Sequence, residues 1–134
     1  MKRFYLDTSI WLDYYENRGS NGEFALKLIR RLIKEDSIII YSDLHIIELK
    51  NLGYSLNEIY TILKIAKDIN LRFVHTNKKQ IEEVKKIKMT RAVPYRDILH
   101  CILARDNEAL MVSTDKHFEY LKDIVRTAKP IELI

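Results

Sequence analysis

Short apolar segments alternate along the chain with longer segments in which apolar residues recur every three or four positions. The short segments, at residues 3–6, 37–41, 71–74 and 109–113, are rich in β-branched and aromatic residues and predict buried strands. The longer segments predict amphipathic helices, one of which has an apolar face formed by Ala25, Leu28, Ile29 and Leu32. Strands that alternate with helices predict an α/β domain with a mostly parallel central sheet flanked by helices.

Capping residues and helix breakers set the expected limits of the other elements. Helices are expected over about residues 10–16, 44–52, 77–89 and 94–106. A further helix is expected after the capping box Ser-Leu-Asn-Glu at 55–58, with an apolar stripe at Ile59, Ile62, Leu63, Ala66 and Ile69. Residues 17–22 predict a loop. After the fourth strand we expect a short helix with Phe118 and Leu121, a weak edge strand at 124–126 and a last strand at 131–133.

The composition is typical of one folded domain. The 134 residues are 47% apolar and 31% charged, which excludes a disordered chain. We expect a single domain over residues 1–134. The formal charge of +4 is compatible with nucleic-acid binding. The single cysteine, Cys101, cannot form an internal disulfide, and neither a leader segment nor an apolar run of about 18 residues is apparent, so we expect a cytoplasmic protein without membrane attachment.

Four acidic residues lie where strands end or where apolar helix faces continue. Asp7 follows the first predicted strand and Asp115 follows the fourth. Neighbouring parallel strands are about 4.8 Å apart, so these two carboxylates converge if the strands are adjacent. Glu48 interrupts the apolar residues of the helix after the second strand, and Asp97 opens the helix that is apolar almost all round.

A shared divalent cation would account for these acids. A desolvated carboxylate without a partner costs several kcal/mol, and apart from Arg96 no lysine or arginine lies on those apolar faces. Oxygen ligands favour Mg²⁺ or Mn²⁺, and we find no Cys/His cluster that would indicate zinc. Each acid also fits a structural role. The Asp7-Thr8-Ser9 segment fits an ordinary N-cap with Thr8 or Ser9 as the capping residue, Asp115 fits a helix cap, Asp97 a first-turn acid, and Glu48 a surface residue.

Four local motifs together resemble the PIN-domain family, and within it the small single-domain VapC-like toxin ribonucleases and their archaeal relatives. The motifs are Asp-Thr-Ser at 7–9, Ile-Ile-Glu-Leu at 46–49, Tyr-Arg-Asp-Ile-Leu-His at 95–100 and Thr-Asp-Lys-His-Phe at 114–118. The resemblance implies a three-layer sandwich with strand order 3-2-1-4-5 and Mg²⁺- or Mn²⁺-dependent endoribonuclease activity. It implies catalytic and metal-binding roles for Asp7, Glu48, Asp97 and Asp115, supported by the hydroxyls of Thr8, Ser9 and Thr114.

The resemblance also implies partners. These are an RNA substrate, single-stranded or structured, a cognate antitoxin protein, and a second copy of the chain in a homodimer. We expect the dimer contact at Tyr54, Leu56 and Ile59. Arg96 and Lys116 are the expected RNA contacts beside the site, with a wider basic surface at Lys78, Lys79, Lys85, Lys86 and Lys88 and stacking aromatic rings at Tyr14, Tyr15 and Tyr95.

Other functions remain open from the sequence. The chain is compatible with an RNA-processing PIN nuclease outside a toxin–antitoxin pair, and with a catalytically idle RNA-binding or assembly module. A phosphotransferase with an aspartyl nucleophile would need an acid two positions after Asp7, where Ser9 stands. A histidine-based ribonuclease would need two cooperating histidines, and no pair among His45, His75, His100 and His117 has a spacing that places both on one helix face.

Overall fold

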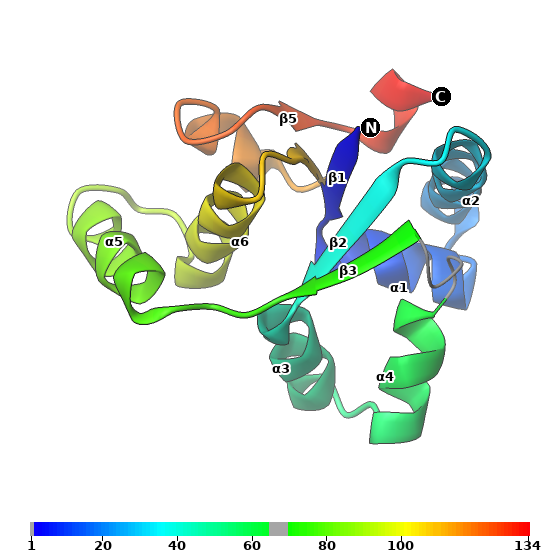
Figure 1. Ribbon diagram of the computed structural model, residues 1–134, viewed down its shortest axis with the longest axis horizontal. Helices are drawn as coiled ribbons and strands as arrows, with labels where there is room; N and C mark the ends of the chain where they lie inside the picture. The colour runs from blue at the N-terminus through cyan, green and yellow to red at the C-terminus, as the bar shows by residue number, and fades with distance from the viewer. Residues whose placement is uncertain (1, 65–69) are drawn as a thin grey trace.

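The computed structural model describes residues 2–64 and 70–134, which form a parallel sheet with helices packed on both of its faces (Figure 1). The strand order is β3-β2-β1-β4-β5. The predicted α/β class and the implied order 3-2-1-4-5 are therefore confirmed. The strands are β1 (Arg3–Leu6), β2 (Ile38–Ser42), β3 (Leu71–Val74), β4 (Leu110–Val112) and β5 (Thr127–Ala128).

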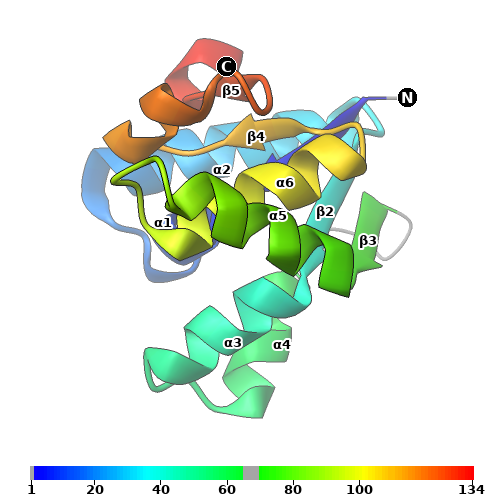
Figure 2. The ribbon, with the colours of Figure 1, turned by 90° about the vertical axis from the view of Figure 1, so that its left-hand side faces the viewer.

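Two hydrophobic layers form because successive strand residues point to opposite faces of the sheet. Phe4 and Leu6 of β1 join one core cluster, whereas Tyr5 joins the other. The first layer is covered mainly by α1 (Thr8–Glu16), α2 (Gly19–Lys34) and α4 (Leu56–Leu63), and the second by α5 (Lys78–Lys88) and α6 (Tyr95–Asp106) (Figures 1 and 2). Among the described helices, none is long and apolar enough to cross a membrane.

The helix α6 is the buried helix that the sequence predicts. Seven consecutive residues, from Ile98 to Ala104, are buried between the sheet and α5. Pro94 stands at its N-cap, where its missing N–H costs nothing. Because α6 is buried, its polar residues must find partners inside the protein, and this decides the surroundings of Asp97 and His100.

The predicted loop at 17–22 is wrong for most of its length. α2 already begins at Gly19, after a turn in which Asn17 adopts the left-handed conformation (φ 52°). The start of α2 lies so close to the end of α1 that a Cβ atom on Gly22 would lie 2.8 Å from the backbone carbon of Asn17. Gly22 therefore permits two helices to pack at their junction, and its glycine signal marks close packing instead of a loop.

The C-terminal elements also differ from the prediction. The short helix is the 3₁₀ helix η2 (Lys116–Leu121), and the edge strand falls at Thr127–Ala128 and not at 124–126. The predicted last strand at 131–133 is wrong, because these residues belong to the 3₁₀ helix η3 (Pro130–Leu133). Pro130 at its start has no N–H for a sheet ladder. Ala66 and Ile69 of the predicted apolar stripe lie outside the described residues.

The helices α3 (Asp43–Asn51) and α4 project from the body of the domain (Figure 2). Together with the C-cap residue of α3, they carry four large apolar side chains that are more than half exposed: Ile47, Leu52, Leu56 and Tyr60. The expected dimer contact was placed at Tyr54, Leu56 and Ile59. Ile59 is fully buried in the core, so its inclusion is wrong.

Candidate active site

The carboxyl ends of β1 and β4 lie side by side and hold Asp7 between them. The backbone N–H of Asp7 donates to the Val112 carbonyl at 2.9 Å. The Oδ2 atom of Asp7 accepts hydrogen bonds from the Ser113 hydroxyl at 2.9 Å and the Ser9 hydroxyl at 3.0 Å. Its Oδ1 atom accepts from the Thr8 backbone N–H, so Asp7 also caps α1. The carboxylate is therefore fixed in one orientation.

Glu48 reaches the same edge from α3. Its Oε1 atom accepts a hydrogen bond from the Thr8 hydroxyl at 2.7 Å and lies 2.5 Å from His100 Nε2. The same His100 nitrogen is 3.9 Å from Asp7 Oδ1, so the imidazole lies between the two acids. The other carboxylate oxygen of Glu48 is 3.7 Å from the Arg96 guanidinium.

Below these acids a chain of buried polar side chains continues into the protein. His100 Nδ1 is 2.6 Å from the Tyr5 hydroxyl, which is 2.8 Å from Ser42 Oγ. The Ser42 backbone N–H donates to His45 Nδ1 at 2.9 Å, so the proton of this ring is on Nε2, which donates to the Leu6 carbonyl at 2.6 Å. Burial lowers the pKa of His45 to about 3, which keeps the ring neutral.

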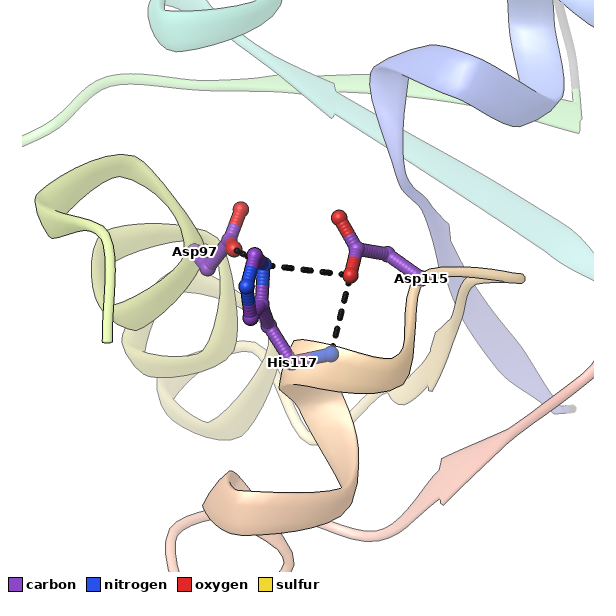
Figure 3. Close-up of side chains that lie close together, drawn as sticks. All are labelled: Asp97, Asp115 and His117. Carbon is purple, nitrogen blue, oxygen red and sulfur yellow. Dashed lines mark hydrogen bonds and ion pairs between the residues drawn. The ribbon is translucent and has the colours of Figure 1, made fainter. Parts of the chain in front are cut away.

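Asp97 and Asp115 meet at a histidine that the sequence did not single out (Figure 3). Asp97 belongs to the first turn of α6, and Asp115 caps η2 by accepting the His117 N–H at 2.8 Å. The Nδ1 atom of His117 is 3.2 Å from an Asp97 oxygen and 3.1 Å from an Asp115 oxygen. One ligand atom from each of the three residues lies within 4.8 Å of the others.

Electrostatic coupling links the acids. Burial, followed by the charges of Asp7 and Asp115, raises the pKa of Asp97 from 3.8 to about 6. Burial also raises the pKa of Asp7, even though His100 opposes the shift. For Glu48 burial acts in the same direction, but the hydrogen bond and charge of His100 contribute to a net pKa below the ordinary value. For Glu48 its partners therefore outweigh burial, whereas for Asp97 burial and the neighbouring acids outweigh the opposing effects of His100 and His117.

The structure thus brings all four predicted acids to the carboxyl edge of the sheet from four separate segments. They form two groups. We call Asp7, Glu48, His100 and Tyr5, with Ser42 and His45, the inner network. We call Asp97, Asp115 and His117 the outer cluster. The inner network is buried and hydrogen-bonded, and the outer cluster is partly open to solvent.

A family model for the PIN domain matches residues 4–124, which include all four acids. The chain belongs to the PIN domain family. No curated protein shows a significant sequence match to it.

Solved structures share this PIN fold at low sequence identity. VapBC2 from Rickettsia felis, bound to a DNA fragment from its promoter, is 15% identical with a TM-score of 0.69, over 95% of this chain and 98% of that chain. FitAcB from Neisseria gonorrhoeae is 16% identical with a TM-score of 0.66, over 97% of this chain and 99% of that chain. FitAB bound to the IR36 DNA fragment is 14% identical with a TM-score of 0.63, over 95% of this chain and 94% of that chain. These likenesses show the fold.

The residues predicted to support the acids are placed as follows. The hydroxyls of Thr8 and Ser9 donate to Glu48 and Asp7, respectively. The hydroxyl that binds Asp7 from β4 is that of Ser113, one residue before the predicted Thr114. Of the expected RNA contacts, Arg96 lies beside Glu48 with an exposed side chain, and Lys116 is exposed at the start of η2.

Sequence reasoning missed two residues of this edge, His100 and His117. The search for cooperating histidines considered spacing along one helix, but the ring centroids of His45 and His100 lie 4.9 Å apart although the residues belong to α3 and α6. A signal for His100 was present, because a histidine on the wholly apolar face of α6 requires a buried polar partner. For His117 the signal was its position two residues after Asp115.

Proposed function

We propose that this PIN domain is a divalent-metal-dependent endoribonuclease that hydrolyses single-stranded or structured RNA through a four-carboxylate site. The observation that carries the proposal is the convergence of Asp7, Glu48, Asp97 and Asp115 at the carboxyl edge of a parallel sheet. Open α/β sheets bind their ligands at this edge. The raised pKa of Asp97 supports it, since the cause is burial beside other acids. Mg²⁺ or Mn²⁺ is the proposed cofactor.

The residues present fit such a cation. Asp97 and Asp115 offer hard oxygen ligands, and within the described part of the chain the buried Nδ1 atom of His117 beside them has no hydrogen-bond partner. Asp7 and Glu48 would add further oxygen ligands. A cation held by these residues would supply Lewis acidity, which lowers the pKa of an attacking water and neutralises charge on the phosphate.

The chain's own side chains orient the ligands and receive the substrate. The hydroxyls of Ser9 and Ser113 hold the Asp7 carboxylate, and Thr8 and His100 hold that of Glu48. Such neighbours fix ligand direction and increase affinity for the ion. The exposed guanidinium of Arg96 lies at the rim, where it is suited to contact a phosphate of the RNA.

We further propose that the chain acts as the toxin of a toxin–antitoxin pair and forms a homodimer. The structural neighbours VapBC2 and FitAB support this reading, since they share the fold over nearly the whole chain. In this chain the exposed apolar side chains of α3 and α4 offer a surface for a protein partner, as patches of this kind do. Light scattering of the purified chain tests the homodimer, and a monomer at high protein concentration would contradict it.

The nuclease is tested with a 5′-labelled single-stranded RNA. We expect cleavage in Mn²⁺ or Mg²⁺, no cleavage in EDTA, and a loss of at least about 100-fold for Asp7→Asn, because metal stabilisation of the transition state contributes several kcal/mol. Hydrolysis by water leaves a 5′-phosphate and a 3′-hydroxyl. Attack by the 2′-oxygen would instead leave a 2′,3′-cyclic phosphate.

Asp36→Asn is the matched control for the same chemical change. Asp36 is exposed in a left-handed conformation (φ 54°) that asparagine tolerates well, so this variant should keep full activity. Cyclic-phosphate ends, undiminished cutting in EDTA, or equal activity of Asp7→Asn and Asp36→Asn would each overturn the carboxylate mechanism.

A further inference from the structure

The Nδ1 atom of His117 lies between two carboxylates without a hydrogen bond. It is 3.2 Å from Asp97 Oδ2 and 3.1 Å from Asp115 Oδ1 (Figure 3). The atom is shielded from solvent although the side chain as a whole is 42% exposed. A buried nitrogen that satisfies no partner in the described part of the chain is costly, so its position calls for a further interaction.

The distances around this nitrogen suit ligands of one ion. Two ligands at right angles about a cation, each about 2.1 Å from it, are separated by about 3.0 Å. The separations of 3.1 and 3.2 Å from Nδ1 to the two carboxylate oxygens are close to this value. The backbone N–H of His117 donates to the same Asp115 oxygen at 2.8 Å, which fixes the histidine beside that acid.

The ring nitrogens of His100 and His45, the other histidines near the site, already have hydrogen-bond partners. Both ring nitrogens of His100 are engaged, by Tyr5 and by Glu48. Both ring nitrogens of His45 are engaged as well, by Ser42 and by the Leu6 carbonyl. At this edge of the sheet, His117 is therefore the histidine placed to bind an ion through nitrogen.

We propose that His117 Nδ1 is a metal ligand together with Asp97 and Asp115, and that it makes the site select a transition-metal ion, Mn²⁺, over Mg²⁺. This inference rests on the proposed metal-dependent function. Mg²⁺ is a hard ion that favours oxygen ligands and retains its water, whereas imidazole nitrogen binds transition-metal ions well. A site made only of carboxylates would bind both ions, whereas a nitrogen ligand increases the affinity for Mn²⁺ relative to Mg²⁺.

Electron spin-echo envelope modulation of the Mn²⁺-loaded protein tests the nitrogen ligand directly. We expect ¹⁴N modulation from a coordinated imidazole in the wild-type chain. His117→Asn should abolish it, because asparagine replaces the nitrogen donor by an amide oxygen of similar reach. His75→Asn is the matched control, since His75 is exposed after β3 and lies outside the cluster, and its modulation should equal that of the wild type.

Calorimetric titration tests the selectivity. His117→Asn should weaken Mn²⁺ binding by about 10-fold or more, the scale typical of perturbed metal sites, while Mg²⁺ affinity changes little. His75→Asn should leave both affinities unchanged. A histidine that only pairs with the two acids would instead change the Mn²⁺ and Mg²⁺ affinities by the same factor.

The outcomes separate this inference from the proposed function. Bound Mn²⁺ without ¹⁴N modulation, or modulation that persists in His117→Asn, overturns the ligand role even if metal-dependent RNA cleavage is intact. An unchanged ratio of Mn²⁺ to Mg²⁺ affinity in His117→Asn overturns the selectivity. A wild-type chain that binds neither ion and cleaves no RNA overturns both proposals.

Discussion

The inner network and the outer cluster share one edge of the sheet, yet the pKa values of Glu48 and Asp97 shift in opposite directions. In the inner network Glu48 is held by Thr8 and His100, and its pKa lies below the ordinary value. In the outer cluster Asp97 has a pKa raised to about 6, first by burial, and His117 Nδ1 has no hydrogen bond among the described residues. Ionisation of Glu48 is therefore favoured by its partners, whereas ionisation of Asp97 is disfavoured by burial and by the neighbouring acids.

The difference follows from the partners of each acid, because the side chains of Glu48 and Asp97 are similarly exposed, at 14% and 16%. His100 and Tyr5 are fully buried, so any unsatisfied polar atom there would reduce the stability of the fold itself. In the outer cluster Asp115 and His117 are partly exposed, at 40% and 42%, and clustered negative charge at such a position favours cation binding. The inner network is therefore the hydrogen-bonded interior of this edge, and the outer cluster is its more exposed part.

The largest expected effect is on stability and concerns His100. His100→Ala should lower the free energy of unfolding in chelator by about 3 kcal/mol, because it removes a buried side chain and leaves Glu48 and Tyr5 without their partner. Urea denaturation followed by circular dichroism measures it. His117→Ala should change the free energy of unfolding by less than about 1 kcal/mol, since the side chain is partly exposed and its Nδ1 atom makes no hydrogen bond within the described part of the chain.

One result would contradict this comparison. Equal losses for His100→Ala and His117→Ala would mean that the outer cluster is as structural as the inner network. Tyr5→Phe sharpens the test, because it removes only the hydroxyl that joins Ser42 to His100 and should cost about 1–2 kcal/mol.

A smaller change in stability, of opposite sign, is expected for Asp97→Asn. Its folded pKa of about 6 lies above its ordinary value of 3.8, so its stability contribution is full below about pH 4 and is lost as pH rises through about 6. After allowance for solvent screening, the loss is about 1 kcal/mol. Asp97→Asn should therefore melt at a higher temperature than wild type at pH 8 in chelator, and at pH 4 the difference should vanish.

Asp36→Asn is again the matched control and should melt like the wild type at both pH values. Saturating Mn²⁺ should reverse the order, because only the complete ligand set gains stability from the ion. A melting temperature of Asp97→Asn that is below that of wild type at pH 8 in chelator would show that the acids of this edge do not repel one another.

Three local patterns predicted something other than what the fold contains. The glycine at position 22 suggested a loop, but the structure uses it to let α2 start against the end of α1. Ile59 was expected at a dimer contact, yet it faces the core. The two-residue strand β5 has too few residues for a recognisable pattern, so its place at Thr127–Ala128 was missed.

The α/β class, most strands and helices, and the meeting of the four acids at one edge of the sheet were predictable from the residues, and the family resemblance implied the strand order. Local periodicity and residues at strand ends are sufficient for these conclusions, because side-chain direction follows directly from the strand or helix period. The catalytic roles of the acids and the metal remain predictions to be tested.

The hydrogen-bond partners of the acids were not predictable from the sequence. Tyr5 and His100 are 95 positions apart, and Asp7 and Ser113 are 106 apart. Ser113 rather than Thr114 reaches Asp7 because of the alignment of β4 beside β1. His117 meets Asp97 only because η2 packs against α6. Such partners depend on the packing of separate elements, and no local pattern specifies what lies across an interface.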